Sequence, residues 1–509
     1  MSTYACEFNE LIGETVTGSL LSRLIRGTIS TGLGKLSTMV LGLVGVMVVT
    51  RHLSAKDLGA FVLITVVVSF LVQVSSFGLG ISLPRFITGT KDELQRRRLV
   101  NTVLCFRLFT IVVVSLIALP FRAQIAGLFG SPLLPGLTIF VPLLFFLQSS
   151  MYLLQSALQG FFLFERIGIS DFIAGFFNFL FIWVFVLLLQ RGVVGLIYAK
   201  VISMFVSLGF MYYSIPVKKK IEFHPDVLKE TLAFGFPLQI NDILFFIFSR
   251  IDTVIIGVML GPAGVAYYEV ARKIPEYLGQ IYEAFRCVYF PLISELFMGS
   301  ERKRAAQLLN NSTRLVSFVT AAGALMAWLF GKDLFVLLFS EQYLASVPAF
   351  IWLMVALVVA LVGSTLGMSV VAVGDSDKPA IVNVVHTVVS VVGNLIFIPA
   401  LGIVGAALAS LAGIVATNPL DVLFLRRRDV DVRVREYLKP ILIFGAHAAI
   451  IFLLQPITFL PKVLVVISFL LTSVVLSVIT AEDLAALLAE ARSISLKSMT
   501  ILRSGSNRS

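Results

Sequence analysis

The sequence predicts an all-α polytopic membrane protein with about 14 transmembrane helices. Its 509 residues are 58% hydrophobic and only 14% charged. Hydrophobic segments follow one another from about residue 27 to residue 480, and no connection between them exceeds about 17 residues. A helix needs roughly 20 predominantly apolar residues to cross the hydrocarbon layer, where its backbone groups must be hydrogen-bonded internally. The segments are therefore long enough to span a membrane, and the connections are too short to form a soluble domain.

Fourteen segments meet this length requirement. In chain order they cover residues 27–50, 57–82, 100–121, 133–159, 171–190, 193–215, 232–260, 263–297, 312–330, 347–373, 381–400, 402–425, 437–455 and 462–480. We expect two six-helix lobes related by a pseudo-two-fold axis along the membrane normal, followed by two extra helices. The expected parts are an N-terminal segment (1–26), an N-lobe with helices 1–6 (27–215), a linker (216–231), a C-lobe with helices 7–12 (232–425), a basic loop with helices 13 and 14 (426–480) and a tail (481–509).

The distribution of positive charge predicts the orientation of the chain. Basic clusters stand at alternate connections, at residues 96–98, 218–220, 302–304 and 426–428, and the connections on the opposite side hold only six of the 40 Lys and Arg residues. Because cytoplasmic connections carry an excess of Lys and Arg, we expect both termini in the cytoplasm and the protein in the cell membrane. The net charge of +11 then reflects topology anchors near anionic lipid and does not indicate nucleic acid.

The sequence contains no complete motif of an enzyme or of a metal site. The three cysteines and four histidines are dispersed along the chain, so they form neither a disulfide framework nor a metal site. Gly27, Gly32, Gly34 and Lys35 partly resemble a phosphate-binding loop, but the motif is not completed and the stretch lies in a predicted span. We therefore expect no catalytic residue, no metal and no cofactor.

The chain contains an internal repeat. LSAKDLGAFVLI, which begins at Leu53 and leads to Pro84, corresponds to LGPAGVAYYEVA, which begins at Leu260 and leads to Pro291. The sequence GVVG at residues 192–195 likewise corresponds to GIVG at residues 402–405, and the two offsets are 207 and 210 residues. Two matches with nearly the same offset indicate duplicated six-helix halves. An even number of helices in each half predicts a parallel repeat about an axis along the membrane normal.

Three passages carry a resemblance to a known family. They are RHLSAKDLGAFVLITVVVSFLVQVSSFGLGISLPRFI, FGFPLQINDILFFIFSRIDTVIIGVMLGPAGVAYYEVARKIPEYLGQIYEAFRCVYFPLISEL and NLIFIPALGIVGAALASL. Over about residues 20–425 the chain resembles the polysaccharide-exporter, or oligosaccharide flippase, branch of the multidrug, oligosaccharidyl-lipid and polysaccharide exporter superfamily. The resemblance implies two lobes around a central cavity lined by helices 1, 2, 7 and 8. It also implies alternating access that moves a prenyl-(pyro)phosphate-linked oligosaccharide from the cytoplasmic to the outer leaflet.

Charged residues inside the predicted spans indicate a polar cavity independently of the resemblance. A charge is costly where it faces lipid, so each should face protein or water and is a candidate functional residue. The candidate cations for substrate binding are Lys35, Arg107, Arg250, Arg272, Lys273 and Arg286, and Lys200 is a further base inside a span. Arg suits phosphate oxygens through its planar fork of donors. We expect Lys35, in the N-lobe, to face the cluster of spans 7 and 8 across the cavity.

The candidate carboxylates lie mostly on one face of span 8. They are Asp242, Asp252, Glu269, Glu276 and Glu283. The spacing places Glu269 within reach of Arg272 and Lys273, and Glu283 within reach of Arg286. These groups are either ion-pair partners that hold the lobe together or binders of a coupling proton or sodium ion. Pro275, in the middle of the stripe, removes one backbone hydrogen bond and is the candidate kink for a gate.

The sequence favours a flippase or exporter of a lipid-linked oligosaccharide over two alternatives. A multidrug exporter of the same superfamily would use an aromatic, acidic pocket, whereas this chain carries more bases than acids in its spans. A glycan-processing membrane enzyme would use long outer loops with carboxylates, and the longest expected outer connection, at about residues 331–346, holds only Asp333 and Glu341. The expected partners are the lipid-linked glycan, membrane lipid, a candidate coupling H⁺ or Na⁺ and candidate glycan-assembly enzymes.

Overall fold

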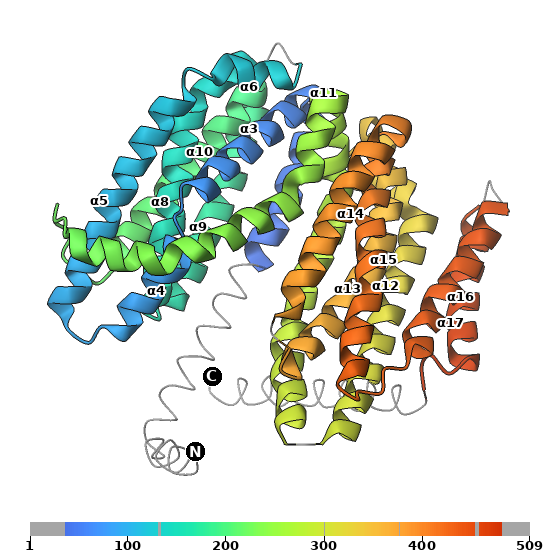
Figure 1. Ribbon diagram of the computed structural model, residues 1–509. Coiled ribbons are helices and arrows are strands. Elements are labelled where there is room, and N and C mark those ends of the chain that lie inside the picture. Colours follow the sequence, from blue (N-terminus) through green and yellow to red (C-terminus); the bar gives the residue numbers. More distant parts are fainter. Residues whose placement is uncertain (1–35, 131–133, 300, 376, 454–457, 481–509) are drawn as a thin grey trace, which may run out of the picture. The chain divides into compact units, whose positions relative to one another are not determined.

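The computed structural model describes residues 36–130, 134–299, 301–375, 377–453 and 458–480, and this part of the chain is helical without a β-strand (Figure 1). In chain order its helices are Leu36–His52, α3 (Ala55–Val74), α4 (Leu79–Gly89), α5 (Glu93–Ala118), α6 (Arg122–Leu128), α7 (Leu134–Leu137), η1 (Thr138–Phe140), α8 (Val141–Gly160), α9 (Phe164–Ile182), the π-helical η2 (Trp183–Leu188), α10 (Gly192–Ser214), α11 (Pro225–Met298), α12 (Arg302–Leu338), η3 (Glu341–Ser346), α13 (Val347–Ala372), α14 (Lys378–Leu401), α15 (Ile403–Arg427), α16 (Val434–Leu453) and α17 (Phe459–Val475).

The helices confirm the predicted all-α membrane fold. Within the described ranges, 11 helical segments are long and apolar enough to cross a membrane, and two shorter apolar helices, Leu36–His52 and Phe459–Val475, add to them. One of the 11 segments, Ser249–Met298, is 50 residues long and carries most of predicted spans 7 and 8. Each of the fourteen predicted spans overlaps one of these helices.

A single glycine separates spans 7 and 8 within α11. Gly261 has φ 73° and ψ −174°, a conformation that side-chain-bearing residues rarely adopt, and it interrupts an otherwise helical segment. Pro262 follows directly, and proline is favoured in the first turn of a helix because it has no backbone N–H to leave unpaired. Gly261 is the one non-helical position in α11, so the backbone keeps helical dihedral angles at Pro275. The gate expected at Pro275 stays a prediction.

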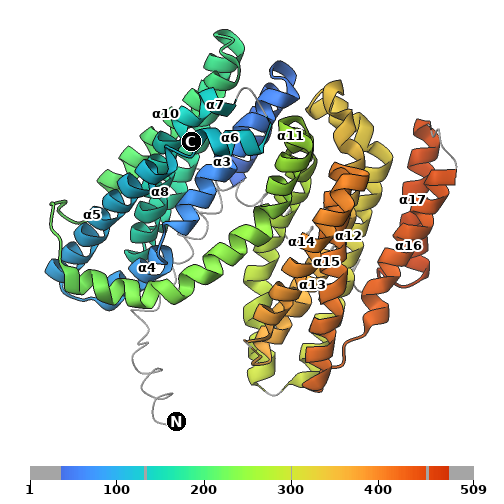
Figure 2. The ribbon, with the colours of Figure 1, turned by 45° about the horizontal axis from the view of Figure 1, so that its top comes forward.

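The chain divides into two compact units. Within the described residues, the first comprises those from 36 to 273 together with 335–346, and the second comprises those of 274–334 and 347–480. In the first unit α3, α5, α8 and α10 run side by side, and in the second α12, α13, α14 and α15 form a bundle (Figures 1 and 2). This division follows packing, whereas the predicted lobes, with their linker at 216–231, follow the sequence repeat. The lobe boundaries stay a prediction.

The outer surface of the first unit is apolar where lipid would cover it. One face of α5 exposes Phe109, Val112 and Leu116, which recur at three- and four-residue steps. On the inner side, Leu79 and Leu83 of α4 pack with Leu154 and Leu158 of α8. Because lipid is as apolar as these side chains, close van der Waals packing rather than escape from water selects the inner face.

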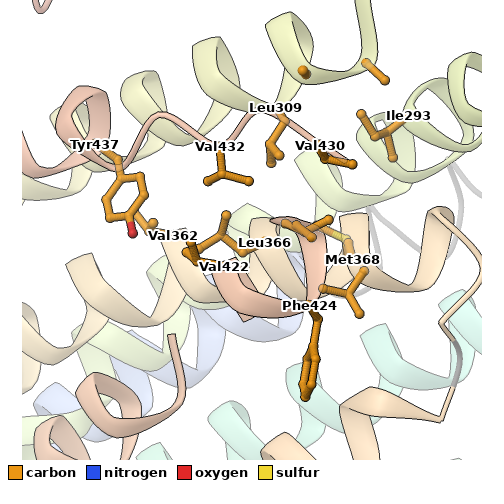
Figure 3. Close-up of a cluster of buried hydrophobic side chains, with 14 of the residues drawn as sticks. Ile293, Leu309, Val362, Leu366, Met368, Val422, Phe424, Val430, Val432 and Tyr437 are labelled. Carbon is orange, nitrogen blue, oxygen red and sulfur yellow. The ribbon is translucent and has the colours of Figure 1, made fainter. Parts of the chain in front are cut away.

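The second unit has its own apolar cluster, shown in Figure 3. Val362 and Leu366 of α13 pack with Val422 of α15, and Leu309 of α12 lies in the same cluster. The hairpin of α16 and α17 packs on α12, where the ring of Phe318 stacks on Phe469 of α17 with their centroids 5.8 Å apart. The two C-terminal helices are therefore part of the second unit.

The two halves of the predicted repeat share a local geometry. Gly192 and Gly402 both have positive φ, 58° and 61°; Gly192 is the first residue of α10, and Gly402 stands immediately before α15. Three residues on, a Cβ added at Gly195 would lie 2.9 Å from the carbonyl oxygen of Phe185, and one at Gly405 would lie 2.1 Å from that of Phe397. In both halves a glycine turn thus lets one helix fold back against the backbone of the helix before it, which supports the duplication.

Candidate functional site

A buried carboxylate in the first unit is held between two cations of α11. Glu269 is buried, and its carboxylate lies 2.7 Å from Nζ of Lys273 and 3.5 Å from a guanidinium nitrogen of Arg250. The pair of Glu269 with Lys273, four residues apart, confirms the spacing argument. Arg250 comes from the part of α11 before the break at Gly261, so the turn at that glycine brings the two segments together.

Asp252 forms the second ionic contact of this region. Its carboxylate lies 3.7 Å from a guanidinium nitrogen of Arg272 and accepts a hydrogen bond of 2.7 Å from the hydroxyl of Tyr268. Arg272 also donates to the backbone carbonyl of Ser249 at 3.4 Å. Arg272 is thereby fixed across the break in α11, with its guanidinium between the two segments of the helix.

A fourth cation approaches from α10. Lys200 is half-buried and lies close enough to Lys273 for the two charges to interact. Within the described residues its amino group has neither a hydrogen bond nor an ion pair. Its position inside a span marked Lys200 as an unusual base, but only the folded structure shows that it lies near Lys273. We call Lys200, Arg250, Arg272 and Lys273, with Asp252 and Glu269, the cationic cluster.

The cationic cluster carries an excess of positive charge. Three cations of α11 face two carboxylates, and Lys200 adds a further amine. Every carboxylate already has a cationic partner, so the surplus lies with the bases. In a partly buried setting such a surplus is strongly attractive to a multivalent anion, because a low local dielectric strengthens electrostatic interactions.

Arg107 has a different environment in the first unit. It is 2% exposed, and its guanidinium donates to the backbone carbonyl and the hydroxyl of Ser75 and to the hydroxyl of Ser149, the last at 3.0 Å. These bonds connect α5 to α8 and to the end of α3. They give Arg107 a clear role in packing, and its predicted contact with substrate stays a prediction.

Other predicted site residues belong to the second unit. Arg286 pairs with Glu283, as the three-residue spacing predicted: one guanidinium nitrogen donates to both carboxylate oxygens, at 2.7 and 2.9 Å. Its Nε also contacts the sulfur of Met368 at 3.4 Å. Glu276, half-buried, and Pro275, buried, lie on the same stretch of α11. Whether this group serves the same ligand as the cationic cluster stays a prediction.

Two further predicted site residues lie outside the part of the chain that the structure describes. Lys35 lies outside the described residues, as does the side chain of Asp242. The expectation that Lys35 faces the cluster of spans 7 and 8 therefore stays a prediction. Among the residues that are described, no three His, Cys, Asp or Glu side chains come close enough together to hold a metal ion.

Outside the spans, charged residues of the second unit line a pocket of about 430 Å³. Its residues are Asp375, Asp377, Lys378, Phe424, Arg427 and Arg428. Arg428 donates to both oxygens of Asp375, and this hydrogen bonding lowers the pKa of the Asp375 carboxyl from its ordinary value. The pair joins the loop before α14 to the end of α15, so it has the geometry of a structural clasp.

The sequence matches the model of a known protein family. A family model described as polysaccharide biosynthesis protein covers residues 48–348. A relative from Haloferax volcanii, "Probable low-salt glycan biosynthesis flippase Agl15", is 22% identical over 408 residues, which are 79% of this chain and 83% of that protein. A relative from Klebsiella pneumoniae, "Uncharacterized membrane protein in cps region", is 25% identical over 450 residues, 84% of this chain and 87% of that protein.

Solved structures of membrane transporters share the fold of this chain. The lipid II flippase MurJ in an inward closed conformation has a TM-score of 0.72 and 17% identity, covering 87% of this chain and 97% of that one. An inward-facing multidrug resistance transporter of the MATE family has a TM-score of 0.65 and 20% identity, covering 77% and 94%. At these identities the likeness establishes the fold, which is the one that the resemblance in the sequence implied.

Proposed function

This chain belongs to the polysaccharide biosynthesis protein family, and on that premise we propose that it is a flippase for a prenyl-(pyro)phosphate-linked oligosaccharide. It moves this lipid from the cytoplasmic to the outer leaflet by alternating access. The flippase name of the Haloferax volcanii relative and the fold shared with the lipid II flippase MurJ support the proposal. The observation in this chain that carries it is the cationic cluster on α10 and α11.

The charge of the cluster matches the head group of such a lipid. Phosphate oxygens cannot leave water without new partners, because an unpaired charge is very costly in an apolar medium. Arg250 and Arg272 offer planar forks that bind phosphate oxygens in pairs, and Lys200 and Lys273 add point charges. Before substrate arrives, Glu269 and Asp252 keep the bases in place. Bound phosphate then competes with these carboxylates for the guanidinium groups.

The remaining parts of the substrate need other surroundings. The hydroxyl-rich glycan passes through the wet cavity between the lobes, while the prenyl tail stays in lipid. Carrying negative charge outward from a negative cytoplasm is favourable by roughly 2.3 kcal/mol per charge per 100 mV, so nucleotide hydrolysis is not required. No catalytic step is assigned to the chain, which acts as a transporter in the cell membrane with both termini in the cytoplasm.

Arg107, Arg286 and Lys35 are proposed as further cavity cations, and Pro275 as a flexing point of the gate. Of the carboxylates, Asp252 and Glu269 act as ion-pair partners, which their contacts with Arg272 and Lys273 favour. Asp242, Glu276 and Glu283 remain candidates for a coupling H⁺ or Na⁺. Glycan-assembly enzymes that supply the lipid are the proposed partners on the cytoplasmic side.

The test is lipid mass spectrometry on cells depleted of the protein, combined with labelling that distinguishes the two leaflets. We expect a prenyl-linked glycan to accumulate on the cytoplasmic side, and its mass identifies the substrate. Re-expression of the wild-type chain should clear it. A chain in which Arg250 and Arg272 are both replaced by Gln should fail to do so, although it reaches the membrane in equal amount.

The multidrug-exporter alternative has its own support in the shared MATE fold. It predicts a different outcome of the same depletion. If no glycolipid changes while the cells accumulate cationic dyes, the flippase proposal is wrong and the multidrug function replaces it.

A further inference from the structure

Asp421 of α15 is a buried carboxylate that faces α13. It is 4% exposed and lies one turn from Asn418, whose amide donates to the carbonyl of Val359 at 3.0 Å. A Cβ added at Gly367 would lie 3.8 and 3.9 Å from the two carboxylate oxygens of Asp421. One at Gly363 would lie 2.1 Å from Oδ1 of Asn418. The two glycines of α13 thus leave a notch into which the polar side chains of α15 fit.

The surroundings of Asp421 differ from those of the other buried carboxylates. In the described part of the chain three carboxylates are buried, namely Glu269, Asp375 and Asp421. Glu269 is paired with Lys273, and Asp375 is paired with Arg428. Asp421 forms neither a hydrogen bond nor an ion pair with any described residue. Asp421 is therefore the one buried carboxylate among the described residues that has no cationic partner.

The helices around Asp421 offer it no cation. α13 carries no titratable side chain over its whole length. α14 carries Lys378, which pairs with Asp377, and His386, whose ring lies against Gly413, about two turns of α15 away from Asp421. The basic residues at the end of α15, Arg426, Arg427 and Arg428, lie beyond ion-pair distance of Asp421.

Residues of α11, α12 and α16 reach the same side of α15 through the apolar cluster of Figure 3, and the buried Arg314 of α12 forms no ion pair with Asp421 in the described structure. The titratable and charged groups there are already engaged elsewhere or are neutral phenols. Tyr282 and Tyr289 hydrogen-bond to Thr365 and Ser369 of α13, Arg286 pairs with Glu283, and Tyr437 packs in the apolar cluster. None of these groups neutralises the charge of Asp421.

A carboxylate in this position is neutralised most simply by a proton. Removing an ionised carboxylate from water without a partner is very costly, and such groups bind a proton instead. The cost falls once water enters the notch, because hydration again stabilises the charged form. Opening and closing the α13–α15 contact would therefore change the proton affinity of Asp421.

We propose that Asp421 is a proton-binding site that takes up and releases one H⁺ in each transport cycle. An oxygen of the carboxylate binds H⁺ and becomes a hydroxyl, the charge changes from −1 to 0, and no other bond is made or broken. The closed α13–α15 contact holds the protonated form, and hydration of the notch releases the proton. The coupling to export rests on the proposed flippase function, whereas the protonation of Asp421 does not.

Infrared spectroscopy of the purified full-length protein in lipid vesicles tests the protonation directly. We expect the carbonyl band of a protonated carboxyl group at neutral pH, shifted by exchange into D₂O. The band should be lost in Asp421→Asn and retained in the matched control Asp333→Asn, because Asp333 is exposed and paired with Lys462 at 2.6 Å. Persistence of the band in Asp421→Asn would overturn the proposal, as would its absence from the wild-type protein.

A second measurement separates proton coupling from sodium coupling and from the choice of substrate. Clearance of the accumulated glycolipid is followed in depleted cells that express each variant, at several external pH values and at several Na⁺ concentrations. We expect clearance by the wild type and Asp421→Glu to depend on pH, and clearance by Asp421→Asn to lose that dependence. Unchanged pH dependence in Asp421→Asn, or dependence on Na⁺ alone, contradicts proton coupling through Asp421. If depletion changes no glycolipid but the infrared band behaves as expected, the flippase function fails and the proton site stands.

Discussion

The cationic cluster of the first unit and Asp421 of the second unit are opposite kinds of buried charge. In the first unit, the cationic cluster has more bases than carboxylates, and both of its carboxylates are paired. In the second unit, Asp421 is a buried carboxylate without a base. A surplus of fixed cations attracts a multivalent anion, whereas an isolated carboxylate attracts a proton. One fold thus contains the two kinds of site that an exporter of an anionic lipid would use if it is coupled to H⁺.

The largest effect is expected when the surplus of positive charge in the cationic cluster is removed. Arg272→Glu places a third carboxylate beside Asp252 and removes the cation that pairs with it. Removing one partner of a charge pair with a bound anion costs about 2–5 kcal/mol of binding free energy, which corresponds to a loss of roughly 30-fold or more in the affinity for the anion. Glycolipid clearance in depleted cells measures the effect.

Two controls accompany this change. Arg272→Lys keeps the charge and should retain part of the activity, because lysine lacks the planar fork but not the attraction. Arg302→Glu alters an exposed residue, whose nearest carboxylate is 3.9 Å away, and should leave clearance close to the wild-type level. Equal losses in Arg272→Glu and Arg302→Glu would remove the cationic cluster from the mechanism.

The notch in the second unit can be filled without any change of charge. Gly363→Ala places a methyl group against Asn418 and forces it away from the carbonyl of Val359. We expect a loss of about 1–3 kcal/mol in stability, from overpacking and from the broken hydrogen bond. Thermal unfolding in detergent measures it.

Gly445→Ala in α16 is the matched control for the notch. A Cβ there meets nothing within 4 Å, so the exchange should be neutral or stabilising by up to about 1 kcal/mol, since alanine favours a helix over glycine. If both alanine variants unfold at the wild-type temperature, α13 and α15 do not pack as described.

A smaller effect is expected at Lys200. Lys200→Gln removes the one cation of the cluster that has no carboxylate partner, so no buried charge is left uncompensated. The loss is one charge-assisted contact with phosphate, about 1.5–3 kcal/mol at most, and less where water replaces it. We expect export to fall by roughly tenfold with no loss of stability. Unchanged export together with unchanged stability would place Lys200 outside the site.

The smallest effect concerns the clasp between the buried Asp375 and the exposed Arg428. The hydrogen bond from Arg428 lowers the pKa of Asp375, so the pair stabilises the folded state at neutral pH. A depressed folded-state pKa means that this stabilisation is present above the ordinary pKa of aspartate and is lost as the pH falls through the lower, folded-state value. Asp375→Asn should therefore unfold at a slightly lower temperature than the wild type at pH 7, and the difference should disappear in acid. A difference that grows in acid would contradict this sign.

The sequence anticipated the helices better than the contacts between them. The fourteen spans and the break before span 8 follow from local rules, because hydrocarbon thickness fixes the length of an apolar segment and glycine followed by proline interrupts a helix. The pairs of Glu269 with Lys273 and of Glu283 with Arg286 were also predictable, since they lie within one turn on one helix. Pro275 was the candidate kink because proline removes a backbone hydrogen bond from a helix. In the structure the non-helical position of α11 is Gly261.

Lys200 and Asp421 show where local reasoning ends. Lys200 was visible as a base inside a span, but its approach to Lys273 depends on how α10 packs on α11. Asp421 lies five residues before the run of Arg426, Arg427 and Arg428. From the sequence, a carboxylate near the basic end of a helix is expected to be solvated or paired with one of these arginines. The isolation of Asp421 results from α13, which is more than 50 residues earlier in the chain and places glycines opposite it.

The sequence by itself determined the class of this protein, its membrane-spanning segments and the charges that those segments carry, because the bilayer imposes length and polarity one segment at a time. The tertiary structure decided which charges are paired. Pairing depends on distances of a few ångströms between helices that are remote in sequence, and in lipid those distances are set by side-chain packing rather than by hydrophobicity. For that reason the grouping of the surplus bases into one cluster and the solitary carboxylate in the other unit became visible only in the folded chain.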